Sequence, residues 1–269
     1  MLYSFYLILN IIKNTPLYPH WLETKNRAKG DRNICKYLFG KVIETGAVNL
    51  SYKQEILKTN KNVSLYITSD YSSWNDYRSN YKMLNRSFFG RIMGVLMERH
   101  SKKKQEMICS ANCLPFLQSS FDSYCSFEVI EHIRNPKQMF LEANRVLKNG
   151  GICVMSVPFL YREHPLESLD FQRFTRNGIR NLAEDCGFRL ITNTTYSFIG
   201  TTGASQFNQF IIRVIVEAML PVKVMILTIS PFIFLVSNIL GYLLDLIQKD
   251  MRFATRYHLV FKKLDSGNK

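Results

Sequence analysis

Short apolar runs alternate with longer amphipathic segments along most of the chain. Strand-like runs occur at residues 42–43, 64–68, 121–127, 152–157 and 257–262. The run at 152–157 is continuously apolar and rich in β-branched residues, which is typical of a strand buried on both faces of a sheet. The pattern therefore predicts several short strands, at least one of them central.

Two amphipathic helices separate these runs. Asn135 and Pro136 form a helix cap followed by a proline at the first helical position, and apolar residues then repeat at helical spacing up to the glycine pair at 150–151, where we expect the helix to stop. Thr175 caps a second helix that ends before Gly187. Strand, helix, strand, helix in this order predicts an α/β fold with a parallel sheet and crossover helices.

A polar, aromatic-rich insertion at residues 71–104 interrupts this pattern, with helical character at most around 91–99. The chain becomes hydrophobic from Phe210 to Ile247, and residues 224–244 carry no charge over 21 positions. That length is sufficient for a transmembrane helix.

Pro231, Asn238 and Gly241 interrupt the hydrophobic segment, and the strand-like run 257–262 follows it. We therefore expect a pair of apolar helices. Three roles stay open for them: packing in the core or against a partner, contact with one face of a membrane, or a true span.

These features divide the chain into three parts. At 269 residues one large domain is the default. We expect an N-terminal helical cap at 1–40, an α/β domain formed by 41–209 and 255–264, and a hydrophobic helical insertion at 210–250.

Composition and charge narrow the possible partners. With 46% hydrophobic and 21% charged residues, the chain has the composition of a globular protein. Its net charge is +14, but Lys102–Lys104 is the only tight basic run before the pair Lys262–Lys263. Scattered cations argue against a nucleic-acid interface and suit an anionic membrane surface at least as well.

The six cysteines form no C-x-x-C pair, and four lie in apolar runs, so we expect reduced core residues in a cytoplasmic protein. The apolar segment 1–12 lacks the basic start and the cleavage site of a secretory signal, and it is too short to span a bilayer. The helical insertion could still bring the protein to the inner face of the membrane.

Polar residues follow the first two predicted strands, where ligands bind in open parallel sheets. Gly46 lets the backbone approach a ligand closely, and Glu44 can hold an ammonium group or a water. Asp70 can accept both hydroxyls of a ribose. For each of these residues the alternative interpretation is an ordinary turn residue without a binding role.

Two further strands end in similar positions: a third strand, expected just before Ser110, and a fourth, the run 121–127. Ser110 and Ala111 offer small polar and backbone groups to an adenine edge. Ser126, Phe127 and Glu128 end the fourth strand and face the same crevice. The sequence thus predicts a nucleotide-like cofactor at the carboxyl edge of the sheet.

The run LPFLQSSFDSYCSFEVIEHIRNPKQMFLEANRVLKNGGICVMSVPF closely resembles the class I S-adenosylmethionine-dependent methyltransferases of the type 11 group. The resemblance implies a Rossmann-like sheet with helices on both faces, S-adenosylmethionine as cofactor, and binding by the residues just named. The continuation, PFLYREH to DFQRFT, is similar to a subset associated with surface polysaccharides or lipid-linked sugars, in which a hydrophobic helical insertion precedes the last strand.

The sequence also departs from the family pattern at three positions. Val48 stands where the family has a second glycine, Ser51 where it has a proline, and Ser110 where it has an acidic residue. Two interpretations therefore remain: an enzyme that methylates oxygen or nitrogen of a small-molecule, sugar or lipid-linked acceptor, or a catalytically inactive methyltransferase-like interaction protein. RNA methylation ranks below both.

His164 is the candidate general base, because it follows the strand ending at Pro158 and titrates near neutrality; a loop-shaping histidine is the alternative. Asp170 and Arg173 either line the substrate pocket or anchor the next helix.

Glu128, Glu131, His132 and His164 are similar to the magnesium ligands of small-RNA 2′-O-methyltransferases. The same E-x-x-E-H element is widespread in family members without a metal. We therefore expect no metal site.

Overall fold

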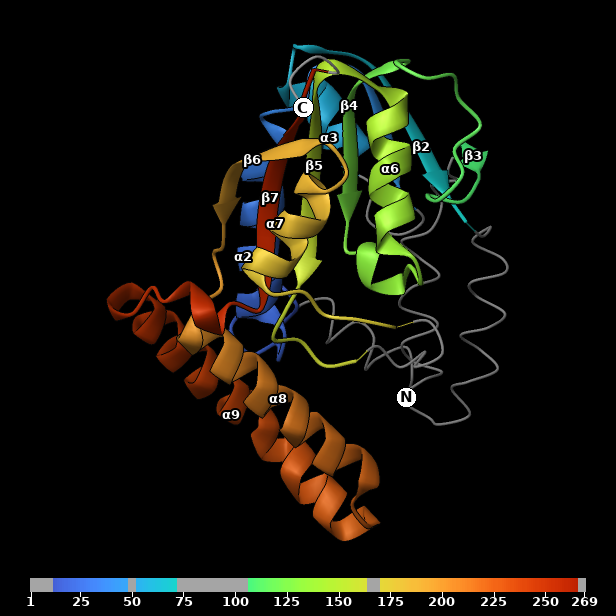
Figure 1. Ribbon diagram of the computed structural model, residues 1–269. Helices are drawn as coiled ribbons and strands as arrows, with labels where there is room; N and C mark the ends of the chain where they lie inside the picture. Colours follow the sequence, from blue (N-terminus) through green and yellow to red (C-terminus); the bar gives the residue numbers. More distant parts are fainter. Residues whose placement is uncertain (1–11, 48–51, 72–105, 164–169, 266–269) are drawn as a thin grey trace.

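The computed structural model describes residues 12–47, 52–71, 106–163 and 170–265 (Figure 1). Seven strands form one sheet in the order β3-β2-β1-β4-β5-β7-β6. The strands are β1 (Gly40–Thr45), β2 (Val63–Asp70), β3 (Met107–Ile108), β4 (Phe121–Phe127), β5 (Leu147–Pro158), β6 (Phe188–Thr194) and β7 (Arg256–Lys263). Strands β1 to β5 run parallel, whereas β7 runs antiparallel between β5 and β6.

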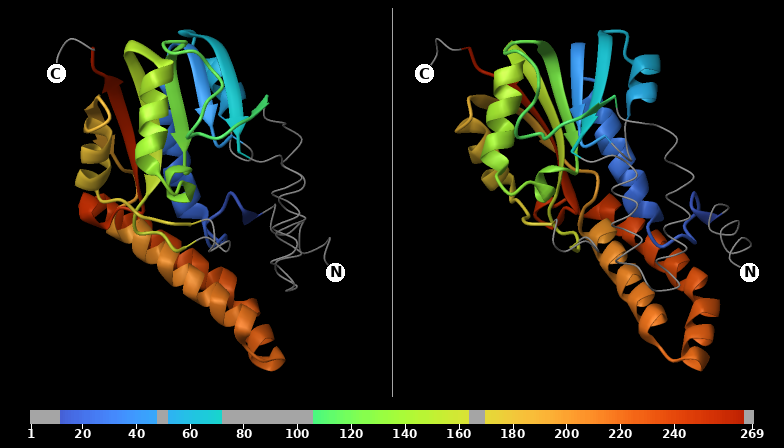
Figure 2. Two further views of the ribbon diagram at one scale, coloured as in Figure 1. Left: turned by 45° about the vertical axis from the view of Figure 1, so that its right-hand side comes forward. Right: turned by 90° about the vertical axis from the view of Figure 1, so that its right-hand side faces the viewer.

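Helices cover both faces of the sheet (Figure 2). On one face α6 (Pro136–Val146) and α7 (Arg176–Glu184) pack over a core that contains Phe140 and Ile179. On the other face α2 (Trp21–Cys35) and α3 (Lys53–Thr59) pack over a smaller cluster with Ile34 and Ile56. The expected Rossmann-like α/β fold is confirmed.

The predicted helix starts are confirmed. The Asn135 side chain accepts a hydrogen bond from the Gln138 amide at 3.2 Å. The Thr175 hydroxyl accepts one from the Gly178 amide at 3.1 Å. These bonds satisfy amides that the first helical turn leaves without an intrahelical partner.

The predicted end of α6 is wrong. The helix ends at Val146, and β5 already begins at Leu147, before the glycine pair at 150–151. The Lys263 ammonium donates to the carbonyls of Asn144 and Leu147, both at 2.7 Å. A side chain from the last strand therefore satisfies carbonyls that local sequence would assign to a continuing helix.

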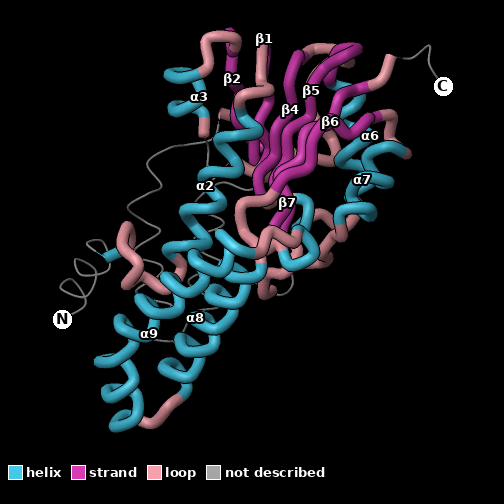
Figure 3. The backbone as a smooth tube through the Cα atoms, turned by 90° about the vertical axis from the view of Figure 1, so that its left-hand side faces the viewer, coloured by secondary structure: helices cyan, strands magenta, loops and turns pink. Residues whose placement is uncertain are grey.

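Of the two strands β7 and β6 at one edge of the sheet, only one was predicted. The run 257–262 becomes β7, as expected, whereas β6 was not predicted (Figure 3). Strand β6 is half exposed and pairs with β7 alone. Its hydrophobic alternation is consequently weak.

The expected pair of apolar helices is present as α8 (Ile199–Glu217) and α9 (Leu220–Ile247), so the predicted boundary at 210 falls inside α8. Of the described residues, only α9 has the length and hydropathy to cross a membrane, with a mean hydropathy of 2.1. Just 22% of its apolar window is buried, so packing in the core is excluded for most of α9. The two helices project from the sheet as a hairpin (Figure 1).

The short 3₁₀ helices η1 (Ile130–His132) and η3 (Met251–Phe253) complete the fold. Cys35, Cys125, Cys153 and Cys186 are buried free thiols, as expected. The predictions for segment 1–11, for most of the insertion at 71–104 and for His164 fall outside the described residues.

Candidate active site

The carboxyl ends of the parallel strands bring most of the predicted site residues to one edge of the sheet. Thr45 at the end of β1 pairs with Ser69 of β2 and with Ser126 of β4. Asp70 pairs with Ile108, and its carbonyl accepts a hydrogen bond from the Cys109 amide at 2.8 Å. The carboxyl ends of β1, β2 and β4 therefore lie side by side at one edge of the sheet, with the short β3 next to β2.

Gly46 sits at the centre of this edge in a conformation that requires glycine. Its φ is +76°, and a Cβ at this position would collide with Cγ2 of Val129. Val129 belongs to the turn after β4, so the loops after β1 and β4 touch at this point. A larger residue would strain the backbone and push the two loops apart.

Glu44 is buried below this loop. Its Oε2 accepts a hydrogen bond from the Tyr66 hydroxyl at 3.0 Å, and Tyr66 lies in the apolar cluster beneath α2 and α3. Burial, together with Cys125 and Glu44, raises the pKa of Tyr66 well above its ordinary value, so the hydroxyl remains a donor. Glu44 thus stands at the base of the predicted cofactor loop; Val48 and Ser51 lie outside the described residues.

The residues predicted to lie beside the adenine are small. Ser110 is half-buried, and its hydroxyl accepts a hydrogen bond from the Asn112 amide at 3.2 Å. Ala111 is buried next to it. Ser126 is buried too, and its hydroxyl has no hydrogen-bond partner within the part of the chain that the structure describes. An orphaned hydroxyl at the end of β4 is a group that a polar ligand could satisfy.

Phe127 contacts the start of α3, and Glu128 contacts α2. The Phe127 ring meets Tyr52 edge to face, with centroids 5.0 Å apart. Glu128 has a φ of +57°, which is uncommon for a non-glycine residue, and it pairs with Arg256 at 2.7 Å and Arg27 at 3.6 Å. Strained backbone of this kind is concentrated at functional sites.

A buried ionic cluster, which we define as Glu23, Arg27, Glu128 and Arg256, lies beside the edge. Arg256 pairs with both Glu23 and Glu128, and its side chain is only 1% exposed. Burial lowers the pKa of Arg256, but Glu128 and Glu23 more than offset this and raise it above its ordinary value. Arg256 therefore remains charged.

Sequence reasoning missed three members of this ionic cluster. Arg256 opens the antiparallel strand β7 and pairs with Pro158 at the end of β5. An antiparallel strand starts where its parallel neighbours end, so the orientation of β7 was the signal that could have placed Arg256 at the site. Glu23 and Arg27 lie four residues apart on α2, the spacing of one helix face.

Glu131 is fully buried, and neither carboxylate oxygen has a hydrogen-bond partner among the described residues. Burial, followed by the charge of Glu128, raises the pKa of Glu131 well above its ordinary value. His132 Nε2 lies 3.8 Å from Glu131 Oε1. Within the described ranges no three His, Cys, Asp or Glu side chains are grouped for a metal ion, and Glu128 is paired with arginines instead.

Asp170 and Arg173 form a two-point ion pair, with Arg173 Nη2 at 2.7 Å from Asp170 Oδ2. Arg173 also donates to the carbonyls of Tyr161 at 3.4 Å and Arg162 at 3.0 Å. The pair ties the segment after β5 to the segment before α7. This geometry favours the anchoring role, and contact of either residue with substrate stays a prediction.

A family model described as a methyltransferase domain matches residues 92–155. The matched part of the chain thus resembles a methyltransferase domain. The match covers the third and fourth strands and α6, and it agrees with the expected enzyme class. No curated protein matches the chain.

Solved structures share the fold. The [4+2]-cyclase SpnF is 13% identical, with a TM-score of 0.50 over 88% of this chain and 81% of its own. An S-adenosylmethionine-dependent methyltransferase from Mesorhizobium loti is 12% identical, with a TM-score of 0.49 over 91% and 98%. A putative sarcosine dimethylglycine methyltransferase from Galdieria sulphuraria is 14% identical, with 0.47 over 92% and 85%. At such low sequence identity the similarity shows the fold alone, and it does not identify the methyl acceptor.

Proposed function

We propose that this methyltransferase domain transfers a methyl group from S-adenosylmethionine to an oxygen or nitrogen atom of a small-molecule, sugar or lipid-linked acceptor in the cytoplasm. The observation that supports it best is the convergence of Gly46, Asp70 and Ser126 at the carboxyl ends of three neighbouring strands. Ligands of open α/β sheets bind at the carboxyl ends of the strands, which supports a cofactor at this edge.

The residues at the edge fit the cofactor in polarity and size. Gly46 allows its backbone to lie against the methionine part, Asp70 has the carboxylate that ribose hydroxyls need, and the buried Ser126 hydroxyl needs a polar partner. Ser110 and Ala111 leave room for an adenine edge. Glu44 supports the loop from below through its contact with Tyr66.

The bound cofactor supplies a methyl group on a sulfonium, which is already a good leaving group. The protein then has to align the acceptor and, for a hydroxyl, accept its proton. His164 after β5 is the proposed base.

Charge balance at the edge favours a neutral acceptor over RNA. In the ionic cluster, the two arginines Arg27 and Arg256 meet the two acids Glu23 and Glu128. RNA recognition depends on cations that are available to phosphates. Arginines already paired inside the protein do not supply such cations, so a sugar or small-molecule hydroxyl suits this site better.

The inactive alternative rests on the departures from the family pattern at Val48 and Ser110, of which only Ser110 lies within the described residues. The Ser110 hydroxyl accepts the Asn112 amide, and this position carries no charge toward the adenine. A domain without catalysis would bind S-adenosylmethionine weakly or not at all.

The decisive assay incubates the full chain with methyl-labelled S-adenosylmethionine and four acceptor sets: small-molecule alcohols and amines, free sugars, lipid-linked sugars and transfer RNA. We expect label in one of the first three fractions and none in RNA. Asp70→Ala should abolish transfer, while Asp185→Ala, an exposed residue beyond α7, should not. Label in RNA alone, or cofactor binding without transfer to any acceptor, would refute the proposal.

A further inference from the structure

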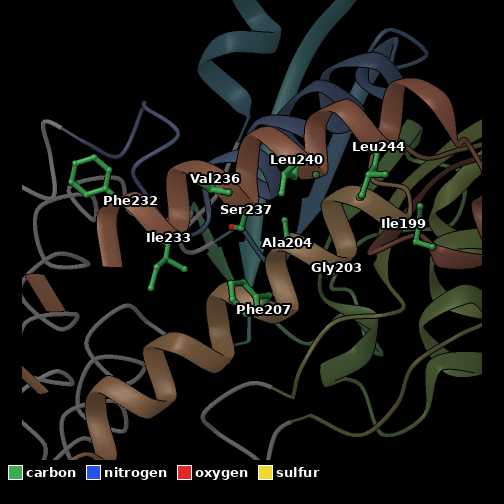
Figure 4. A pocket seen from close by; sticks show the side chains of 12 residues that line it. Ile199, Gly203, Ala204, Phe207, Phe232, Ile233, Val236, Ser237, Leu240 and Leu244 are labelled. Carbon is green, nitrogen blue, oxygen red and sulfur yellow. The ribbon is translucent and has the colours of Figure 1, made fainter. Parts of the chain in front are cut away.

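The α8–α9 hairpin exposes apolar side chains over most of its length. A groove of about 620 Å³ runs between the two helices, lined almost wholly by apolar side chains and glycines (Figure 4). Phe207 of α8 and Phe232, Val236, Leu240 and Leu244 of α9 line it and are exposed to solvent, Phe232 to 71%. Monomeric soluble proteins rarely expose a continuous apolar surface of this extent, so the groove needs an occupant.

The hairpin is a rigid arm. The backbones of α8 and α9 touch at Gly200 and Gly241, where neither residue has room for a Cβ. Asp245 of α9 accepts hydrogen bonds from the amides of Gly200 at 2.7 Å and Thr201 at 3.1 Å, and thereby caps α8. The exposed apolar face of the hairpin is consequently held in one position relative to the sheet.

The base of the arm is joined to the carboxyl edge of the sheet. Gln206 of α8 donates to the carbonyl of Leu160, just after β5, at 3.1 Å. Thr202 donates to the carbonyl of Phe253, just before β7, at 2.6 Å. The arm therefore starts beside the candidate active site (Figure 1).

Cationic and aromatic residues surround the base of the arm. Lys25 lies with its ammonium 4.8 Å from the Trp21 ring and 5.8 Å from the Tyr242 ring. Lys249 and Arg252 are exposed just after α9. Two acidic residues also lie at the base of the arm: Asp250 pairs with Arg252, and Asp245 caps α8. Exposed cations next to Trp and Tyr are typical of a membrane–water interface.

The far end of the arm is charged as well. Arg213 and Glu217 form an exposed ion pair at 2.6 Å, and Lys223 lies in the first turn of α9. The apolar stretch thus has polar groups at both ends. An arm of this kind suits a bilayer surface, where both ends reach the headgroups.

We propose that the α8–α9 hairpin docks peripherally on an anionic phospholipid bilayer, with its groove face among the acyl chains and the cations of both ends at the headgroups. A span by α9 alone is excluded, because β7 follows α9 and pairs with β5 and β6 in the same sheet. A span by both helices also fails, because α8 is charge-free only over residues 199–212. That length is about 21 Å, short of the roughly 30 Å hydrocarbon core.

Docking of this kind holds the carboxyl edge at the membrane surface. If methyl transfer is the activity, a lipid-linked acceptor reaches the site from the bilayer; this step alone rests on the proposed function. Binding to the bilayer does not require the cofactor. The two proposals can therefore fail separately.

Co-flotation with vesicles tests the docking. The full-length protein is mixed with phosphatidylcholine vesicles that contain or lack phosphatidylglycerol. We expect stronger binding with phosphatidylglycerol and an at least tenfold lower partition coefficient for Phe232→Asp. Leu117→Asp is the matched control, because Leu117 is 83% exposed but lies away from the hairpin, and it should bind like the wild type.

A charge variant tests the headgroup contact separately. Lys249→Gln should weaken binding to the phosphatidylglycerol vesicles about fivefold, whereas Lys58→Gln on α3 should leave it unchanged. A wild-type protein that floats with neither vesicle would overturn the proposal. So would equal binding of Phe232→Asp and wild type, or a dimer in light scattering that Phe232→Asp dissociates, since a second copy would then cover the groove.

Discussion

Gly200 and Gly241 bring two helices into backbone contact. A Cβ on Gly241 would stand 2.7 Å from the carbonyl oxygen of Gly200, and a Cβ on Gly200 would overlap the carbonyl of Gly241. Small residues permit this approach and take the place of interlocking side chains. The hairpin owes its fixed shape to this crossing, although most of its surface is exposed.

Gly200→Ala should therefore destabilise the hairpin, by about 1–3 kcal/mol for an overpacked contact. Gly203→Ala, one turn further along α8, meets nothing within 4 Å and should be neutral or stabilise by up to about 1 kcal/mol. Urea unfolding of the two variants measures the difference. Equal stabilities would show that the two helices do not cross as described.

Gly46→Ala should both strain the loop after β1 and displace Val129. The left-handed backbone alone costs an alanine about 1–2 kcal/mol. Gly150→Ala provides the control, because Gly150 has a φ of +73° but its nearest neighbour is Lys262 Cε at 3.6 Å. Both variants should lose stability in thermal unfolding, and only Gly46→Ala should also lose affinity for S-adenosylmethionine. Adding Val129→Ala should restore part of that affinity.

Arg256→Met should destabilise the fold strongly, because it leaves Glu23 and Glu128 buried without their shared cation. Loss of one partner from a buried ion pair typically costs about 3–5 kcal/mol. Arg252→Met breaks an exposed pair with Asp250 and should leave the free energy of unfolding almost unchanged. Chemical denaturation of both variants at pH 7 makes the comparison; similar losses would contradict the account of the ionic cluster.

Asp31 gives stability a defined pH dependence. Burial raises the pKa of Asp31 from 3.8 to about 6, against the hydrogen bond from Tyr52. A raised pKa stabilises the fold fully below the unfolded pKa, and this contribution is lost as the pH rises through about 6. Asp31→Asn should therefore match the wild type near pH 4 and exceed its stability by up to about 3 kcal/mol at pH 8.

Urea unfolding from pH 4 to 8 measures this difference, with the exposed Asp185→Asn as control. His258 Nε2 lies 3.5 Å from Asp31, but burial lowers the pKa of His258 to about 3, so its imidazole is neutral throughout this range. Titration of His258 in the unfolded chain affects wild type and variant alike. A difference that does not vary with pH would refute the raised pKa of Asp31.

The sequence was informative where structure depends on local chemistry. Asn135 and Thr175 cap the helices they were expected to cap, and the apolar run 152–157 lies within central β5. The sequence was not informative where contacts between residues far apart in the chain determine the structure. Lys263 sets the end of α6 from 117 residues beyond Val146, and β6 is stabilised through its pairing with β7.

The same distinction holds at the site. Gly46, Asp70 and Ser126 could be found because each lies at the carboxyl end of its strand or directly after it. Arg256 could not, because an arginine at the start of a strand is unremarkable until the strand is known to run antiparallel. Glu23 and Arg27 resemble the charges of a solvated helix face until Arg256 and Glu128 bury them.

Calorimetric titration with S-adenosylmethionine tests the central claim most directly, since every proposed role at the carboxyl edge presupposes a bound cofactor. The account predicts one site per chain, with affinity reduced roughly tenfold to a hundredfold in Asp70→Ala through loss of charged hydrogen bonds to the ribose, and unchanged in Asp185→Ala. Absence of binding by the wild-type chain at millimolar cofactor, or equal affinities for wild type and Asp70→Ala, would contradict it.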